Sequence, residues 1–139
     1  MILNTKGQIV HNEWYKTAQI RRNVSLDSFI VMPNHVHGII VINAANRRGT
    51  MPRAPASKFE HFGKPVSNSI PTIIRGFKSA VTRRVRIRVT CCIPVWQRNY
   101  YEHIVRDESD LEQIREYIEN NPIRWLEDEN HPENIKRSK

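Results

Sequence analysis

The sequence predicts an α+β domain in which helices flank a small antiparallel sheet. Apolar residues recur at helical spacing in three stretches, and two runs rich in β-branched residues are separated only by Pro33-Asn34. The chain of 139 residues is 39% hydrophobic and 26% charged, which is enough for one modest core. We therefore expect one domain over residues 1–126, followed by a polar tail over residues 127–139 that frays.

The first predicted helix begins after Asn4 and ends before residues 21–23. Asn4 is a favoured capping residue, and Val10, Trp14 and Thr17 recur on one helical face. The apolar stripe stops at the polar run of residues 21–23, so we expect the chain to leave the helix there.

Residues 24–32 and 35–42 read as the two strands of a hairpin, with Pro33-Asn34 as the turn. Side chains alternate along a strand, so His35 and His37 share one face and Val36 points to the other. Two imidazoles side by side form half of a divalent-metal site.

Residues 44–69 contain three prolines and two glycines with little periodicity, which predicts a mobile loop. Ser69 begins the next predicted helix, whose apolar stripe includes Ile73, Phe77 and Val81. The alternation in residues 86–89 predicts that the chain leaves this helix as an extended segment.

Residues 94–105 read as a strand with aromatic content. Arg98 lies among Trp96, Tyr100 and Tyr101, which is typical of a base-stacking platform beside a phosphate contact. The same aromatic residues could equally pack beneath a sheet.

The last predicted helix begins with a capping box at residues 109–112 and ends before Pro122. Tyr117 and Asn121 are one turn apart on one face of this helix. If that face docks on the hairpin, Asn121 can supply an amide oxygen to a metal held by His35 and His37. Tyr117 would then attack a phosphodiester polarised by that metal.

The net charge of +8 is unevenly distributed, because no Asp or Glu occurs from His61 to Tyr101. A one-sided basic field favours polyanions, of which nucleic acid is the commonest, over a merely solubilising face. The candidate DNA contacts are Arg75, Lys78, Arg83, Arg84 and Arg98. No apolar run is long enough to span a bilayer and the start lacks a signal peptide, so we expect a cytoplasmic protein without a membrane partner.

Three motifs in this order resemble the single-tyrosine HUH transposases, and most of all their REP-associated tyrosine transposase branch. The motifs are Val31-Met32-Pro33-Asn34-His35-Val36-His37-Gly38-Ile39-Ile40, Trp96-Gln97-Arg98-Asn99-Tyr100-Tyr101 and Tyr117-Ile118-Glu119-Asn120-Asn121-Pro122. The resemblance covers most of the chain.

The resemblance implies that His35 and His37 are metal ligands, that Asn121 is the third ligand, and that Tyr117 is the nucleophile. It implies Mg²⁺ or Mn²⁺ as cofactor, and single-stranded DNA with imperfect palindromic hairpins as partner. The family cuts one strand, forms a 5′-phosphotyrosine with a free 3′-OH, and rejoins strands, as a monomer or homodimer. Its fold is a ferredoxin-like antiparallel sheet flanked by helices, and this chain is expected to lack the family's first strand.

The sequence is also compatible with other functions and with other roles for some residues. A domesticated, N-terminally truncated relative would bind DNA hairpins without cutting them, and a structural protein would need no metal at all. Tyr100 and Tyr101 are rival nucleophiles, although neither precedes a ligand by one helical turn. His103 is expected to pack on the sheet. A histidine-triad nucleotide hydrolase is disfavoured, because Ile39 stands where a third alternating histidine is needed.

Overall fold

The computed structural model describes residues 2–43, 68–89, 94–127, 131 and 133–134. Its elements follow in the order α1 (Thr5–Ile20), β1 (Val24–Val31), β2 (Val36–Ile42), α2 (Ile70–Val89), α3 (Glu108–Asn120) and a 3-10 helix (Trp125–Glu127). The two strands form an antiparallel sheet. The α+β prediction is therefore confirmed, as are the first helix and the hairpin.

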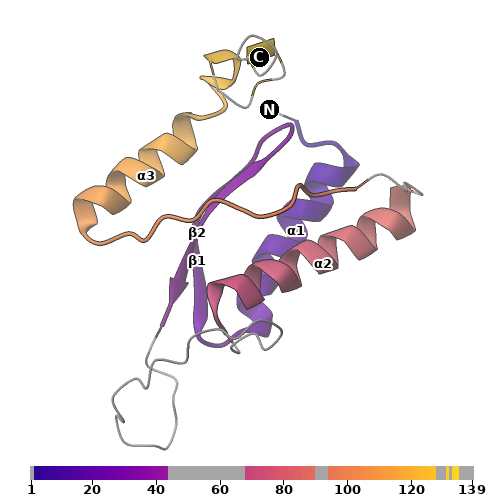
Figure 1. Cartoon of the computed structure of the whole chain (residues 1–139), viewed down its shortest axis with the longest axis horizontal. Helices are drawn as coiled ribbons and strands as arrows, with labels where there is room; N and C mark the ends of the chain where they lie inside the picture. Colours follow the sequence, from indigo (N-terminus) through magenta and orange to yellow (C-terminus); the bar gives the residue numbers. More distant parts are fainter. Residues whose placement is uncertain (1, 44–67, 90–93, 128–130, 132, 135–139) are drawn as a thin grey trace, which may run out of the picture.

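The hairpin lies between two helical layers, with α1 and α2 on one face and α3 on the other (Figure 1). Phe29 pairs with Gly38 and faces α1, where its ring stacks on Trp14 with centroids 4.5 Å apart. Ile30 pairs with His37 on the opposite face, where the His37 ring meets Tyr117 of α3. Strand alternation thus assigns the histidines to the α3 layer.

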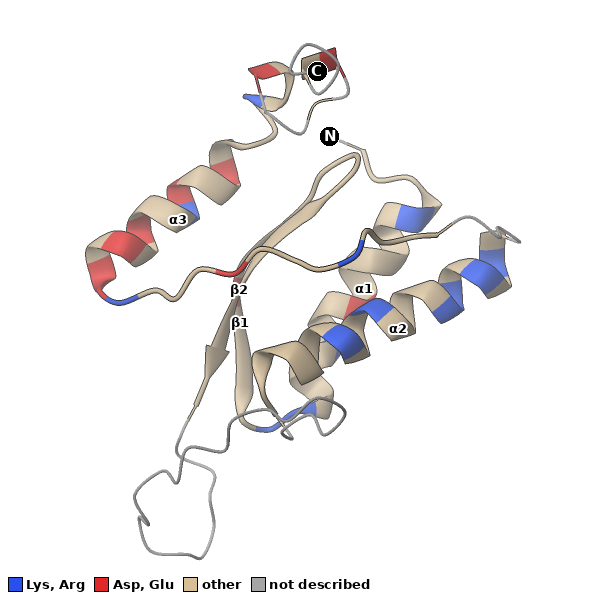
Figure 2. Ribbon diagram, in the orientation of Figure 1, with Lys and Arg blue, Asp and Glu red and all other residues tan. Residues whose placement is uncertain are grey.

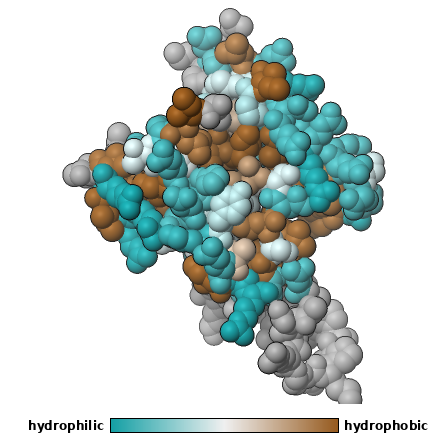
Figure 3. Space-filling view, turned by 180° about the vertical axis from the view of Figure 1, so that it is seen from behind, coloured by the Kyte–Doolittle hydropathy of each residue, from teal (hydrophilic) through white to brown (hydrophobic). Residues whose placement is uncertain are grey.

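The main core lies between the hairpin and the α1–α2 layer. Its buried cluster consists of Ile9, Val10, Trp14, Val31, Phe77, Val81 and Val85. Among the described residues several large apolar side chains stay exposed, including Ile20 and Ile104. The view from behind shows apolar side chains gathered near the middle of that face, between hydrophilic ones (Figure 3).

The α1 helix begins as the sequence predicts. The Asn4 side chain accepts a hydrogen bond from the backbone N–H of Gly7 at 2.9 Å. This bond satisfies one of the donors that every helix leaves free in its first turn.

The prediction that residues 86–89 leave the helix is wrong, because α2 continues to Val89. Val85 is fully buried and follows Phe77 and Val81 at four-residue spacing, and Val89 packs against the same core. The helical repeat of these valines outweighs the short alternation of Arg86, Ile87 and Arg88.

The prediction of a strand over residues 94–105 is also wrong, since the described residues of this segment contain no strand. A strand needs a neighbour for its backbone hydrogen bonds, and β1 and β2 pair only with each other in the described chain. The segment is instead held at its two ends. Lys78 of α2 binds the backbone near Asn99, and Asp110 of α3 binds His103.

The last helix begins two residues earlier than its predicted capping box. Asp107, rather than Ser109, is the N-cap, and its carboxylate accepts a hydrogen bond from the Asp110 N–H at 2.8 Å. The helix ends before Pro122 as predicted, although Asn121 keeps helical dihedral angles. Helical geometry thus continues through Asn121, which decides where its side chain points.

The predicted mobile loop of residues 44–69 lies outside the described residues, apart from residues 68–69. Most of the predicted tail of residues 127–139 lies outside them as well. None of the described helices has the length and apolar character needed to cross a membrane.

Candidate metal and nucleophile site

The hairpin brings His35 and His37 together at the start of β2. Their Nε2 atoms lie 2.9 Å apart and their rings are nearly perpendicular, with centroids separated by 4.6 Å. Both side chains are half-buried. The predicted pairing of the two imidazoles on one face is therefore present in the fold.

Asn34, in the hairpin turn, determines how His35 presents its ring. His35 Nδ1 lies 2.7 Å from Asn34 Oδ1. An amide oxygen only accepts hydrogen bonds, so Nδ1 carries a proton, and in the neutral imidazole Nε2, on the side of His37, is the nitrogen with the lone pair. Metal-binding histidines commonly have such an acceptor on their second nitrogen. From the sequence alone, Asn34 is expected only as a residue of the hairpin turn.

The α3 helix brings Tyr117 to the histidine pair. The rings of Tyr117 and His37 meet edge to face with centroids 5.2 Å apart, and Tyr117 remains 53% exposed. The phenol therefore lies beside the imidazoles while a substrate can reach it from solvent.

Asn121 is buried in the same region. Its side chain is 4% exposed, and its Oδ1 has no hydrogen-bond partner within the described structure. One turn before it Tyr117 contacts His37, and after it Trp125 contacts His35 with centroids 5.8 Å apart. The chain that carries Asn121 is thus held against the histidine pair on both sides. A buried acceptor without a partner costs about 1–3 kcal/mol, and a cation would remove this cost.

The spacing of the two imidazoles fits a divalent cation. Two ligands at right angles, each ~2.1 Å from an ion, lie about 3 Å apart, which matches the separation of the histidine Nε2 atoms. No group of three or more His, Cys, Asp or Glu could hold a metal in the described part of the chain. The candidate donors are neutral, namely two imidazoles and one amide oxygen.

The basic residues predicted to contact DNA lie at separate places on the molecule. Lysine and arginine residues recur along α2, whereas acidic residues recur along α3 (Figure 2). Arg75, Lys78 and Arg83 line one groove of α2 together with Trp96 and Tyr100. Arg86 lines the same groove and is absent from the predicted set, because the sequence reasoning ended the helix before it.

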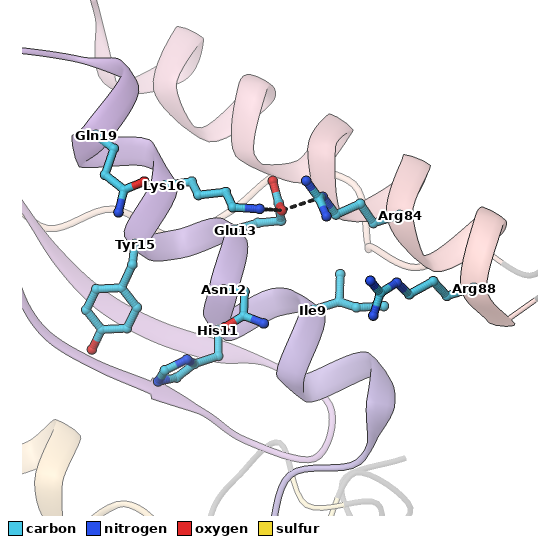
Figure 4. A pocket seen from close by; sticks show the side chains of 9 residues that line it. All are labelled: Ile9, His11, Asn12, Glu13, Tyr15, Lys16, Gln19, Arg84 and Arg88. Atoms are coloured by element: carbon cyan, nitrogen blue, oxygen red, sulfur yellow. Dashed lines mark hydrogen bonds and ion pairs between the residues drawn. The ribbon is translucent and has the colours of Figure 1, made fainter.

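Arg84 and Arg98 lie outside this groove. Arg84 turns toward α1 and pairs there with Glu13, a buried carboxylate that also binds Lys16 (Figure 4). Arg98 is exposed in the segment after α2, and Lys78 rather than Arg98 lies over the rings of Trp96 and Tyr100.

The rival residues from the sequence lie elsewhere. Tyr101 is 90% exposed in the irregular segment, and Tyr100 lines the α2 groove. His103 does not pack on the sheet. Its Nε2 lies 2.9 Å from a carboxylate oxygen of Asp110 at the start of α3.

Comparisons with known proteins give one informative match. A protein of Haemophilus influenzae, described as an uncharacterized protein, is 41% identical over 131 residues, which are 93% of this chain and 71% of that protein. No family model matches the chain. No solved structure matches it significantly.

Proposed function

The chain belongs to the same family as the Haemophilus influenzae protein, and we propose that it is a metal-dependent tyrosine DNA strand transferase. One observation carries the proposal, namely that Tyr117 contacts a histidine whose Nε2 lies 2.9 Å from that of a second histidine. The resemblance to single-tyrosine HUH transposases supports the same assignment. The proposed substrate is single-stranded DNA beside an imperfect palindromic hairpin.

His35, His37 and Asn121 would hold the cation, Mn²⁺ or Mg²⁺. When bound, it would polarise a non-bridging phosphate oxygen and stabilise the charge that develops during the reaction. The neutral protein donors leave the positive charge of such a site available to the phosphate.

Tyr117 acts as the nucleophile. Its phenolic oxygen gives its proton to solvent water and attacks phosphorus, and the bond from phosphorus to the 3′ oxygen breaks as that oxygen takes a proton from water. The products are a 5′-phosphotyrosine and a 3′-OH, which has gained a proton. The reverse attack by a 3′-OH restores a phosphodiester, because the covalent intermediate conserves the bond energy.

Helices α1 and α2 both cover one face of the hairpin, as in a ferredoxin-like sheet, while α3 brings the nucleophile to the other face. We propose that the sheet is ferredoxin-like and that the reaction takes place on cytoplasmic DNA.

A covalent-adduct assay tests the function. Wild type and Tyr117→Phe are incubated with a single-stranded hairpin oligonucleotide and Mn²⁺, Mg²⁺ or chelator. We expect a denaturant-resistant protein–DNA band for wild type with metal only, and none for Tyr117→Phe. Tyr101→Phe is the matched control, because that tyrosine is exposed and lies in the irregular segment outside α3. An undiminished band from Tyr117→Phe would refute the nucleophile assignment.

A second candidate is a module that binds DNA hairpins without cutting them. It is favoured by the basic groove of α2, which does not include the histidine pair. It predicts salt-sensitive binding of DNA and no adduct in any metal. The adduct assay and a binding titration in increasing salt therefore separate the two candidates.

A further inference from the structure

A groove runs along the exposed side of α2, where residues 94–100 turn back against the helix. Its volume is about 710 Å³. Four basic and two aromatic residues line it, namely Arg75, Lys78, Arg83, Arg86, Trp96 and Tyr100. The groove belongs to the α2 layer, whereas the histidine pair lies on the face of the hairpin that α3 covers. The two sites are therefore distinct.

The aromatic wall of this groove is held in place by the protein itself. The Trp96 indole N–H donates to the carbonyl oxygen of Lys78 at 3.1 Å, and its ring packs on Phe77. The Lys78 ammonium donates to the carbonyl oxygens of Asn99 at 2.6 Å and Gln97 at 3.3 Å. Because these bonds join the turn to α2, little ordering is required when a ligand arrives.

Tyr100 offers the accessible ring. It is 40% exposed, while Trp96 is half-buried. The Lys78 Nζ lies 5.8 Å from the ring centroid of Trp96 and 6.0 Å from that of Tyr100. An aromatic ring beside a fixed cation is the arrangement on which unpaired bases stack.

All of the charged residues that line the groove are basic. No carboxylate lines it in the described structure. The pocket between α1 and α2 differs, because Glu13 there neutralises part of the charge of Arg84 and Lys16. Of these two cavities, only the α2 groove combines several basic residues with no carboxylate in the described structure, and this charge is complementary to a phosphate backbone.

We propose that this groove binds an unpaired nucleotide segment of DNA, with a base stacked on Tyr100 and the flanking phosphates paired with Arg75, Arg83 and Arg86. Unpaired bases are favoured over duplex, because the interior bases of a duplex expose no face to stack on a ring. The inference rests on the proposed function for the identity of the polymer. It adds a second contact, away from the cleaved bond, that holds the strand flanking the hairpin.

The test compares the affinity of four proteins for a fluorescent oligo-dT and for a blunt duplex, without metal. Tyr100→Ala should bind oligo-dT about five-fold or more weakly than wild type, since stacking of one base contributes ~1–3 kcal/mol. Tyr100→Phe should bind like wild type, because it keeps the ring. Tyr101→Ala is the matched control, with an exposed neighbouring tyrosine outside the groove, and should also bind like wild type.

Photo-crosslinking locates the base directly. An oligonucleotide that carries 5-iodouracil should attach to Tyr100 or Trp96, as read by mass spectrometry of peptides. The inference is overturned if Tyr100→Ala binds oligo-dT like wild type, if Tyr101→Ala loses as much, if duplex binding falls by the same factor, or if wild type binds no oligo-dT. Because no metal or Tyr117 is involved, a lost adduct with intact Tyr100-dependent binding refutes the strand transferase alone.

Discussion

Arg115 of α3 donates two hydrogen bonds to Asp27 of β1, from Nε to Oδ1 at 3.1 Å and from a terminal nitrogen to Oδ2 at 2.6 Å. This two-point contact fixes both the position and the rotation of the helix. Tyr117 follows Arg115 by two residues, and its contact with His37 depends on the same docking. The ion pair is thus the structural link between the nucleophile and the hairpin.

Loss of this ion pair should make stability less dependent on pH. The hydrogen bonds from Arg115 lower the pKa of Asp27 below its ordinary value. A carboxyl group with a lowered folded pKa stabilises the fold above its unfolded pKa of about 3.9, and this contribution is lost as the pH falls through the folded pKa. Arg115→Ala should therefore melt below wild type near pH ~7, with a difference that shrinks toward pH ~3.

Thermal melts across this range check the expectation, with Arg124→Ala, another arginine near the end of α3, as the control. A difference between wild type and Arg115→Ala that persists unchanged in acid would show that the ion pair is not its cause. The adduct assay on Arg115→Ala should also show a reduced yield, because α3 no longer holds Tyr117 against His37.

Replacement of Asn121 by leucine should separate stability from metal binding. The buried Oδ1 has no partner in the described structure, so its removal should leave the melting temperature of the metal-free protein unchanged or higher. The rise in melting temperature with Mn²⁺ should disappear at the same time. Asn120→Leu changes the neighbouring amide and should keep the Mn²⁺ response. An Mn²⁺ response of wild-type size in Asn121→Leu would rule out Asn121 as a ligand.

Two glycine-to-alanine changes should have opposite effects. A Cβ at Gly38 would lie 2.5 Å from the Trp14 ring and 2.9 Å from that of Phe29, two side chains fixed in the core. Gly38→Ala should therefore destabilise the fold by about 1–3 kcal/mol. At Gly76, inside α2, a Cβ would meet only the end of the Arg21 side chain, at 3.1 Å. Gly76→Ala should gain ~0.5–1 kcal/mol from helix propensity.

Chemical denaturation of both glycine variants provides the measurement. Equal destabilisation by the two changes would contradict the assigned contact between Trp14 and the backbone of β2. In Gly38→Ala the displaced strand should also shift His37, so the Mn²⁺ response should fall together with stability.

Asn34 should control metal affinity without being a ligand. Its Oδ1 accepts the Nδ1 proton of His35, which leaves Nε2 as the nitrogen that binds. Asn34→Ala should weaken Mn²⁺ binding by about 10–100-fold, whereas Asn34→Asp keeps the acceptor and should restore it. Titration followed by electron paramagnetic resonance gives the affinity for Mn²⁺, and ¹⁵N NMR of the metal-free protein gives the tautomer of His35. A His35 that keeps its Nδ1 proton in Asn34→Ala would refute the role.

Local signals predicted the first helix, the hairpin and the shared face of the two histidines. Each depends on contacts between residues close in sequence. The Asn4 cap reaches only to Gly7, and strand alternation places His35 and His37 whatever packs on them. The predicted end of α2 was wrong for a related reason. The short alternation of residues 86–89 indicates an extended segment, but the longer helical repeat that Val85 continues determines the structure.

Local sequence signals do not predict contacts between distant parts of the chain. Residues 94–105 have the composition of a strand, but strand pairing requires a neighbour that composition does not reveal. The sequence placed Arg98 beside these aromatic rings, but the cation that lies over Trp96 and Tyr100 is Lys78 from α2, and Arg98 does not line the groove.

The sequence by itself determined the elements of the site: two histidines on one face, a tyrosine and an asparagine one helical turn apart, and a basic stretch without acids. These features follow from periodicity and composition, which are properties of the chain alone. The tertiary structure decided which of them meet. The docking of α3 through Arg115 and Asp27 places Tyr117 on His37 and buries Asn121. Likewise, the pairing of Arg84 with Glu13 separates it from the α2 groove, since a buried carboxylate requires a cation within reach.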